Sequence, residues 1–489
     1  MPLSPPLPRR RLSGLFLPVA LSLALGGCSL LPSVGPDYRL PQLTLPAGWF
    51  NAMQRTTAGA DAPATPSLEL AAWWKHLDDP LLDALVDEAI AGGTDLRLAE
   101  ARLRQARAVR QQAIAGFFPS IAGSTAARRG KTGSQPSSTL YDAGFDASWE
   151  IDLFGGTRRG VEAATADLEA SRADLADVRV SLVAEVVQDY VDLRAYQQRL
   201  AIARANLGTQ KETAQIAEWR FMAGLAGATD VEQAKTSLAQ TQAAIPDLEI
   251  GVDAAKNQLA LLLGKTPGSL HEQLAETRPL PEIPSMLATG LPAELLLRRP
   301  DLIAAERRLA AETARTGQKL AQRFPSLTLG GSFGWQAYSL GALGGSETIV
   351  RALTGTLAAT LFDGGRLRAA VAAQDAVQEQ ALVSYEAAVL TALGEVEDAL
   401  VAHAAAYDRI AARRAAVESA RKAAGLARQL YQSGLTDFQT VLDTERTRLS
   451  AEDSLASAQA SLAGSLVKLY KALGGGWSPD QTPNAEKHS

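Results

Sequence analysis

The feature that most constrains this fold is a long stretch of chain without proline. The sequence has 24 prolines, yet none lies between Pro325 and Pro479. Proline interrupts helix interiors and alanine favours them, so this alanine-rich stretch predicts very long helices. At about 1.5 Å per residue, the segments 157–218 and 366–430 would each form a rod of roughly 90 Å. Helices of this length are far longer than those of an ordinary globular protein, so they must pack side by side.

The sequence also contains an internal duplication. Residues 95–120 align without gaps on residues 301–326, and 12 of the 26 positions are identical. Later landmarks recur in the same order, at offsets that drift from 206 to 210 residues. These landmarks are Leu153-Phe154 and Leu361-Phe362, Gly224-Leu225 and Gly434-Leu435, and Leu263-Gly264 and Leu473-Gly474. Two copies of one unit therefore make up most of the protein.

The duplication and the N-terminal signals predict six segments. They are a signal peptide over 1–27, a lipidated N-terminal segment with an equatorial region over 28–94, a first repeat over 95–264, an equatorial linker over 265–300, a second repeat over 301–474 and a C-terminal tail over 475–489. Each repeat is predicted to run helix, β-hairpin, long helix and antiparallel return helix, the return helices covering about 230–263 and 437–473.

Each repeat includes two short segments typical of β-strands. They cover about 120–128 and 141–152 in the first repeat, and about 326–337 and 348–362 in the second. In the second of these segments, apolar Phe145 and Trp149 alternate with acidic Asp146 and Glu150, the period of a half-buried strand. Four strands are too few to close on themselves, and open edges are costly in lipid, so closure requires several chains.

The second long helix shows a coiled-coil period. Its ring-bearing or apolar positions are Val389, Leu393, Val396, Leu400, His403, Tyr407, Ile410 and Val417. Most of the steps between them alternate between three and four residues, which predicts a packing seam against a neighbouring helix. Because His403 lies on this seam, we expect a packed histidine rather than a metal ligand.

The N-terminus indicates export and lipid attachment. Three arginines precede an apolar run over 15–25, which is typical of a secretory signal. The following Leu25-Gly26-Gly27-Cys28 resembles the bacterial lipobox, which implies cleavage before Cys28 and diacylglycerol on its sulfur. Ser29 follows instead of the aspartate that retains lipoproteins at the inner membrane, so we expect a lipid-anchored outer-membrane protein that extends into the periplasm.

Composition and motifs argue against an enzyme. One cysteine, four scattered histidines and four methionines leave little material for a metal centre, and a net charge of −5 gives no reason to expect nucleic acid. The sequence has no P-loop, no G-x-S-x-G motif and no G-x-G-x-x-G motif after a strand. We therefore expect no catalytic residue, no metal and no cofactor beyond the covalent lipid on Cys28.

Seven motifs in order resemble the TolC-type outer-membrane factors, in the NodT-like lipoprotein branch that serves resistance–nodulation–division (RND) efflux pumps. They are Val34-Gly35-Pro36-Asp37-Tyr38, Trp73-Trp74 with Asp79-Pro80, Trp149-Glu150-Ile151-Asp152-Leu153-Phe154-Gly155, Arg220-Phe221-Met222-Ala223-Gly224-Leu225, Arg298-Arg299-Pro300-Asp301, Leu361-Phe362-Asp363-Gly364-Gly365-Arg366 and Lys471-Ala472-Leu473-Gly474-Gly475-Gly476-Trp477. The resemblance implies a mainly α fold with a small β part: a homotrimer whose twelve-stranded β-barrel continues into a twelve-helix α-barrel. It also implies a passive exit duct for drugs or other toxic small molecules, docked through a periplasmic adaptor onto an RND transporter of the inner membrane.

The resemblance further implies a periplasmic gate. Its aperture positions fall on Asp230, Lys235, Tyr431 and Asp443, while Thr440 stands where the family can have a second acid. Alternatively, Asp230 and Asp437 only favour the positive N-termini of the return helices, and Asp443 lies on a solvated face. The helical turns are the points of such a rod farthest from the membrane, so adaptor contacts are expected there. The residues concerned are Arg220, Gly224, Gly434 and Asp437.

Two other functions stay open at this stage. One is the outer-membrane duct of a type I protein secretion system, and the other is a non-conducting periplasmic coiled-coil lipoprotein. The lipobox, Ile245-Pro246 and the Arg298–Asp301 motif favour the pump branch, and a non-conducting coiled coil leaves the alternating strands unexplained. Metal ions also remain candidates for the exported substrate, because a passive duct need not bind what it transports.

Overall fold

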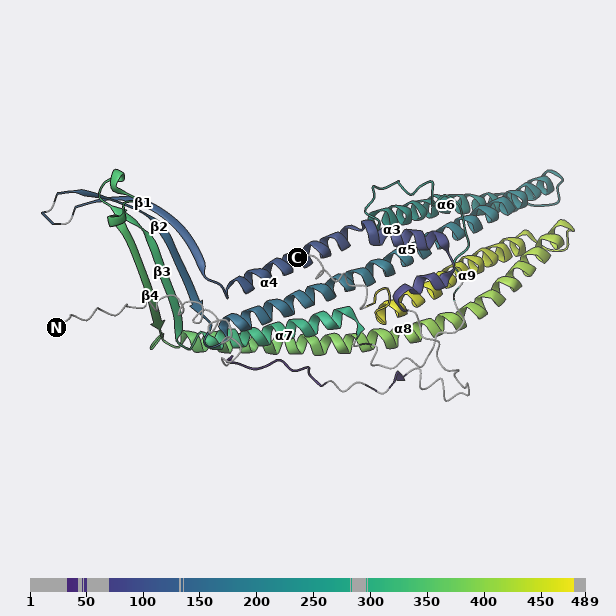
Figure 1. Ribbon diagram of the computed structural model, residues 1–489. Helices are drawn as coiled ribbons and strands as arrows, with labels where there is room; N and C mark the ends of the chain where they lie inside the picture. Colours follow the sequence, from purple (N-terminus) through teal and green to yellow (C-terminus); the bar gives the residue numbers. More distant parts are fainter. Residues whose placement is uncertain are drawn as a thin grey trace, which may run out of the picture. The chain divides into compact units, whose positions relative to one another are not determined.

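A computed structural model describes residues 33–42, 46, 48–50, 70–131, 133–134, 136–281, 283, 296 and 298–478. The predicted signal peptide, Cys28 and most of the C-terminal tail lie outside these residues. The described chain is mainly α-helical and contains one four-stranded sheet (Figure 1). This agrees with the predicted fold class.

The same succession of elements occurs twice along the chain. The first set is α4 (Thr94–Ala115), β1 (Ser120–Gly130), β2 (Ser138–Ile151), α5 (Gly156–Met222) and α6 (Ala228–Leu262). The second set is α7 (Pro300–Ala321), β3 (Ser326–Ala337), β4 (Ile349–Ala358), α8 (Arg366–Gln432) and α9 (Phe438–Ala472), with short 3₁₀ turns η3 (Leu340–Ala342) and η4 (Ser346–Thr348) between its strands. The 3₁₀ segment η1 (Leu70–Leu77) and α3 (Pro80–Gly92) precede both sets. The prediction of very long helices is confirmed, because α5 and α8 have 67 residues each.

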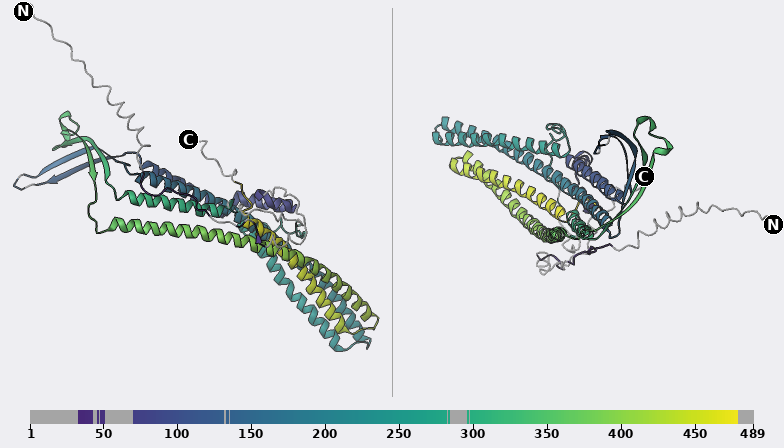
Figure 2. Two further views of the ribbon diagram at one scale, coloured as in Figure 1. Left: turned by 90° about the horizontal axis from the view of Figure 1, so that it is seen from below. Right: turned by 90° about the vertical axis from the view of Figure 1, so that its left-hand side faces the viewer.

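The four strands form one antiparallel sheet in the order β1-β2-β3-β4. Figure 2 shows the blue hairpin of β1 and β2 next to the green hairpin of β3 and β4. Ser120 of β1 pairs with Ser148 of β2, and Ile151 of β2 pairs with Leu327 of β3. Neighbours in sequence are therefore neighbours in the sheet, which leaves β1 and β4 as its two edges.

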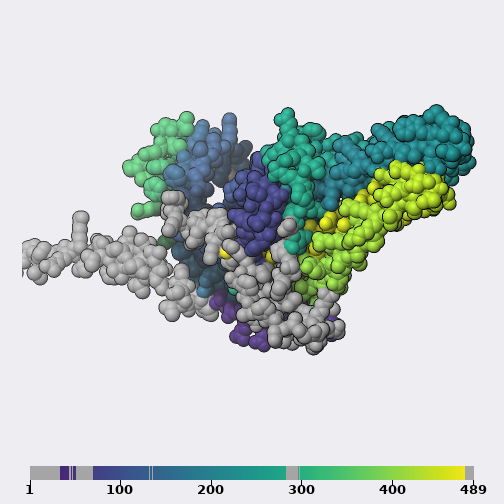
Figure 3. All heavy atoms as spheres, turned by 90° about the vertical axis from the view of Figure 1, so that its right-hand side faces the viewer, coloured from purple at the N-terminus to yellow at the C-terminus, as the bar shows by residue number. Residues whose placement is uncertain are grey.

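The chain divides into two compact units. The sheet unit comprises residues 1–41, 105–169 and 306–383, and the tip unit comprises residues 42–104, 170–305 and 384–489. The tip unit includes the turn between α5 and α6 and the turn between α8 and α9. Figure 3 shows the pair α5 and α6, in teal, beside the pair α8 and α9, in green and yellow. Ion pairs such as Arg199 Nε–Asp453 Oδ1 at 2.6 Å connect α5 to α9.

In the sheet unit, the segment that follows the lipobox is held close to the strand–helix junction. The Val34 amide donates to the Phe154 carbonyl at 3.1 Å, just after β2. Gly35 has φ +97°, and a Cβ there would lie 2.4 Å from the Cα of Gly317 on α7. Arg159 of α5, which is nearly buried, reaches Asp37 at 2.7 Å. These contacts explain the Val34–Tyr38 motif as a docked segment in which only glycine permits the backbone approach.

In the tip unit, alternate positions of the predicted coiled-coil seam were wrong by one residue. Val389, Val396 and Ile410 are buried, but Tyr407 is 48% exposed, and Leu393 and Leu400 are only partly buried. Alanines one position earlier take the inner places, at Ala392, Ala399 and Ala406. Small side chains let the helices approach closely, so the seam alternates larger residues with alanine. His403 stays on the seam, where its Nδ1 lies 3.1 Å from the Ser465 hydroxyl and burial lowers its pKa.

The largest core cluster of the tip unit lies where η1 and α3 meet the long helices. Trp73 stacks on Tyr470 of α9 with ring centroids 4.8 Å apart. Asp79 caps α3 by accepting from the Leu81 amide at 3.0 Å, and it also accepts from the Tyr190 hydroxyl of α5. Burial and this bond to Asp79 raise the pKa of Tyr190 to about 12. The Trp73-Trp74 and Asp79-Pro80 motifs therefore form packing and capping contacts.

Candidate functional site

The sheet has two chemically different faces. Because the registers pair odd residues with odd residues, one face gathers the apolar side chains. The large apolar residues on this face are Ile121, Phe145, Trp149, Ile151, Leu327, Leu329, Phe333, Trp335, Ile349, Leu353 and Leu357, and Arg129 and Arg351 lie on it as well. The opposite face has Ser120, Ser124, Asp142, Asp146, Ser148, Glu150, Thr328, Ser332, Gln336, Thr354 and Thr356. A sheet of this kind suits a wall with lipid on one side and water on the other.

The two helical turns of the tip unit share one geometry. Gly224 and Gly434 have φ of +73° and +76°. In each turn the amide of the leucine that follows the glycine donates to the carbonyl five residues earlier. The Leu225 amide donates to the Arg220 carbonyl and the Leu435 amide to the Leu430 carbonyl, both at 2.8 Å. This is the Schellman arrangement that ends a helix at glycine. The leucines that make these bonds remain 67% and 74% exposed.

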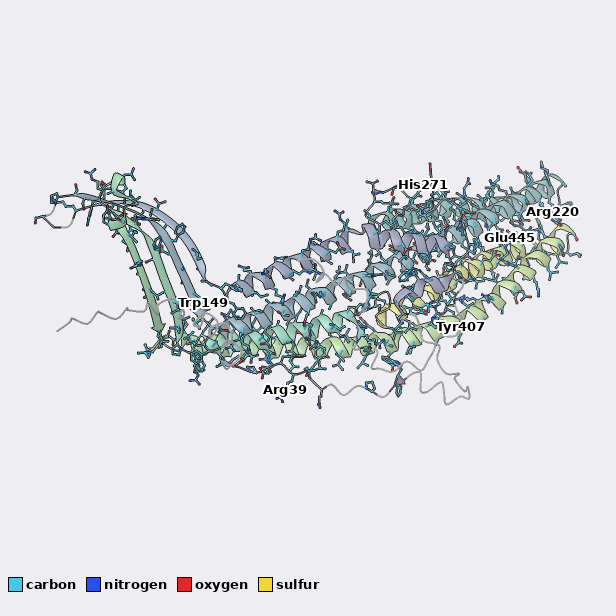
Figure 4. The ribbon with its side chains drawn as sticks, in the orientation of Figure 1. Arg39, Trp149, Arg220, His271, Tyr407 and Glu445 are labelled. Atoms are coloured by element: carbon cyan, nitrogen blue, oxygen red, sulfur yellow. The ribbon has the colours of Figure 1, made fainter. Side chains whose placement is uncertain are left out.

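Arg220 joins the two turns. Its Nη1 donates to the Tyr431 carbonyl at 2.7 Å, and its guanidinium lies 4.7 Å from the centroid of the Tyr431 ring. Figure 4 shows Arg220 at the end of α5, close to the start of the α8–α9 turn. Burial raises the pKa of Tyr431, while the nearby Arg220 lowers it and Asp230 raises it further. Arg220 and Tyr431 are therefore in direct contact, and the gate role of Tyr431 and Asp230 stays a prediction.

The other two predicted gate positions do not join this group within one chain. Lys235 pairs with Glu232 at 2.9 Å, and this bond raises its pKa. Asp443 is exposed and accepts from Gln439 Nε2 at 3.0 Å on its own helix. Their role as an aperture depends on other chains and stays a prediction.

Asp437 has a local role in this structure. It is the N-cap of α9, where its carboxylate accepts from the Thr440 amide at 2.8 Å and from the Thr440 hydroxyl at 2.6 Å. These two bonds lower its pKa. Thr440, which replaces the family's second acid, thus completes a helix cap. This geometry agrees with the alternative interpretation of Asp437, in which the acid stabilises the N-terminus of the return helix.

Sequence reasoning missed a polar cluster below the turns. Glu445 of α9 is 3% exposed, and it accepts from Thr213 of α5 at 3.1 Å and from Arg428 of α8 at 3.2 Å. One buried carboxylate therefore connects three helices. A polar residue on an otherwise apolar helix face was the available signal, but partners 17 and 232 residues away are invisible to local patterns.

A second missed contact is that of Arg299. It pairs with Asp301 at 2.7 Å and Glu395 at 2.8 Å, and it donates to the Ala472 carbonyl at 2.9 Å. The Arg298–Asp301 motif thus closes the C-terminus of α9, where cations are favoured.

The described residues contain no group of three or more histidine, cysteine or acidic side chains placed to hold a metal ion. Among the helices described, none is both long enough and apolar enough to cross a membrane.

An amphipathic sheet joined to long paired helices defines a class of protein: the TolC-type channels. A family model described as outer membrane efflux protein matches residues 85–265 and 291–475. The chain therefore belongs to the outer membrane efflux protein family.

Known relatives and a solved structure agree with this family. The chain is 36% identical over 479 residues to the pyoverdine export outer membrane protein OpmQ of Pseudomonas putida, covering 95% of this chain and 97% of OpmQ. It is 31% identical to the toluene efflux pump outer membrane protein TtgF of Pseudomonas putida, covering 94% and 97%. The structure of the outer-membrane channel OprN matches with a TM-score of 0.84 and 40% identity, covering 91% of this chain and all of OprN.

The protein is thus the outer-membrane component of an efflux pump. It is a passive channel in the outer membrane and not an enzyme.

Proposed function

We propose that the chain forms a homotrimeric exit duct, anchored by lipid on Cys28, that docks through a periplasmic adaptor onto an RND transporter. The observation that best supports docking is the pair of matched turns. A Schellman turn usually buries its last apolar residue against its own helix, but Leu225 and Leu435 are largely exposed. Two equivalent exposed leucines in each chain suit a partner that binds both repeats in the same way.

The exported compounds are proposed to be small and toxic or otherwise unwanted in the periplasm. Relatives whose names specify pyoverdine and toluene share about a third of the sequence along nearly the whole chain. Deletion of the gene should increase accumulation of a fluorescent pump substrate such as Nile red, and the wild-type gene should restore export. Unchanged accumulation in the deletion strain, with related channels also removed, would count against the proposal.

The proposed gate uses threefold copies of Asp230, Lys235, Tyr431 and Asp443 around the duct axis. Carboxylates that converge within about 6 Å repel each other unless cations or hydrogen-bond donors lie between them. Within one chain Arg220 already lies against Tyr431, with its guanidinium 4.7 Å from the ring centroid. The closed state is proposed to depend on this contact and on equivalent contacts between chains.

Lipid attachment gives the first prediction. Replacing Cys28 by alanine should abolish labelling by radioactive palmitate, since this is the only cysteine in the chain. Part of the export activity should remain, because the sheet itself is proposed to embed in the membrane and the lipid is an additional anchor. Palmitate labelling that persists in the alanine variant would refute the lipidation site.

The orientation of the sheet gives the second prediction. Cysteines at Ser137, between β1 and β2, and at Leu340, between β3 and β4, should react with an impermeant maleimide on intact cells. Both positions are exposed, Leu340 by 68%. A cysteine at Ser433, in the α8–α9 turn, is the control and should react only after the outer membrane is permeabilised. The reverse labelling pattern would invert the proposed topology.

The turns give the third prediction. Gly224→Val and Gly434→Val should each weaken co-purification with the adaptor, because a β-branched residue is strained at positive φ. A Cβ at Gly224 meets nothing within 4 Å, so the change should act on the turn itself rather than on core packing. Asparagine tolerates this conformation, and Gly224→Asn should retain docking. Equal complex formation by all three variants would place the adaptor contact elsewhere.

A further inference from the structure

The sheet leaves both of its edge strands unpaired, and the chain contains a template for how they meet. The β2–β3 junction joins the second strand of the first repeat to the first strand of the second repeat. A junction between β4 of one chain and β1 of the next would join the same two kinds of strand. Because edge strands expose unpaired backbone groups, a second copy of this chain is their natural occupant.

The duplication limits the register of that junction to two choices that differ by two residues. An offset of 206 residues maps β1 onto β3, and an offset of 208 maps Phe154 onto Phe362. The hairpins instead pair Ser120 with Ser148 and Ser326 with Ala358, which corresponds to an offset of 210 between β2 and β4. Because Phe145 faces Phe333 within the chain, Ala127 of the partner subunit lies opposite Leu353 in the first register and opposite Gly355 in the second.

Two independent observations agree with this junction. First, both registers pair odd residues with odd residues, so the apolar face continues across the junction, whereas a slip of one residue would reverse it. Second, Phe154 stacks on Phe324 within the chain with centroids 4.7 Å apart. Their repeat equivalents, Phe362 and Phe118, are 91% and 67% exposed, as expected for rings whose partner lies on another chain.

The same junction brings cations together at the loop end of the strands. In the first register the template pair Ala143 and Trp335 becomes Arg351 opposite Arg129 of the partner subunit, and in the second the pair Tyr141 and Ala337 becomes Arg351 opposite Lys131 of the partner subunit. Lys131 of the partner subunit lies just past the end of β1, so both registers bring the same three cations together. Like charges directly opposite each other destabilise a sheet unless an anion lies between them. Arg128 differs, because it belongs to the polar face and lies 3.7 Å from Asp142.

We propose that Arg351 of one chain, with Arg129 and Lys131 of the next, binds a phosphate group of an anionic glycolipid in the outer leaflet. This site rests on the proposed trimer and on the outward orientation of the strand loops. The cations lie on the face that meets lipid, and Arg351 is on the strand next to Trp335, one of the aromatic residues that favour the headgroup level. Arginine binds phosphate oxygens through several donors at once, which suits a lipid phosphate held at a subunit junction.

The register can be tested without reference to lipid. In chains with Cys28 replaced by alanine, cysteines at Leu353 and Ala127 should be joined between subunits by a short bis-alkylating thiol reagent. The pair Leu353 and Ala126 is the matched control, because its second thiol lies on the polar face and should not cross-link. Trimers that form but give no link at Leu353 and Ala127, and none at Gly355 and Ala127, would overturn the site while leaving the proposed function intact. A protein that forms no trimer would overturn both.

Lipid binding can be tested by native mass spectrometry of the delipidated trimer with bisphosphorylated lipid A. The double change Arg129→Gln and Arg351→Gln should weaken binding about tenfold or more, since charged hydrogen bonds to phosphate are lost. Arg128→Gln, an identical change at the neighbouring residue, should leave binding within about twofold. Dephosphorylated lipid A should bind the wild-type trimer as weakly as lipid A binds the double variant.

Three results would contradict the proposal. Equal weakening by Arg128→Gln would indicate general electrostatic attraction rather than a defined site. Unchanged binding in the double variant would place lipid A elsewhere. Full displacement of lipid A by millimolar inorganic phosphate would indicate a site for the free anion instead of a lipid headgroup.

Discussion

Replacing Arg220 by methionine is expected to open the duct. The change removes the hydrogen bond to the Tyr431 carbonyl and the contact with its ring, which together join the α5 turn to the α8 turn. A hydrogen bond from a charged donor contributes about 1.5–3 kcal/mol. If that contact belongs to the closed state alone, its loss raises the ratio of open to closed channels about tenfold or more. Planar-bilayer recordings should show higher mean conductance, and cells should become sensitive to vancomycin.

Tyr431→Phe is the matched control for this experiment. The ring under Arg220 remains, and the Tyr431 hydroxyl is buried without a hydrogen-bond partner among the residues that the structure describes. If the closed state depends on the contacts of Arg220 and not on the Tyr431 hydroxyl, the variant should conduct like the wild type. Conductance that rises equally in both variants would assign the closed state to the hydroxyl, and conductance unchanged in Arg220→Met would move the gate away from this contact.

Replacing Arg428 by methionine is expected to have the largest effect on stability. Glu445 would keep its buried position and lose its only charged partner within the described contacts. Breaking a buried pair from one side costs about 2–4 kcal/mol after allowance for the partial exposure of Arg428. The thermal unfolding midpoint of the purified protein should therefore fall clearly.

Two further variants test whether the buried charge causes this effect. Lys422→Met changes an exposed pair with Glu418 on the same helix and should leave the midpoint unchanged. Adding Glu445→Leu to Arg428→Met should recover much of the loss, because no charge then remains buried. A midpoint unaffected by Arg428→Met would show that Glu445 is stabilised mainly by Thr213.

The long helices, the strands and the glycine turns could be predicted because each has a local signal. The absence of proline, the period-two alternation and the repeated glycines can each be recognised within a short stretch of sequence. The coiled-coil seam was harder to place, since Leu393 and Tyr407 are more hydrophobic than the alanines beside them, yet Ala392 and Ala406 pack inside. Local hydrophobicity does not show how closely two helices approach.

The polar contacts were even harder to predict from the sequence. Arg220 was placed at a turn, but its bond to Tyr431 spans 211 residues. Lys235 and Asp443 were expected at an aperture, and within one chain each is exposed and bonded to its own helix. Contacts that depend on distant segments or on other chains leave no periodic pattern in the sequence.

The most direct test of the account is single-channel recording of the purified wild-type protein in planar bilayers, without nucleotide and without a proton gradient. A passive duct should give discrete, ion-conducting steps under these conditions, and Arg220→Met should enlarge the mean current. A protein that inserts into the bilayer but never conducts, in either form, would contradict the assignment as an exit duct.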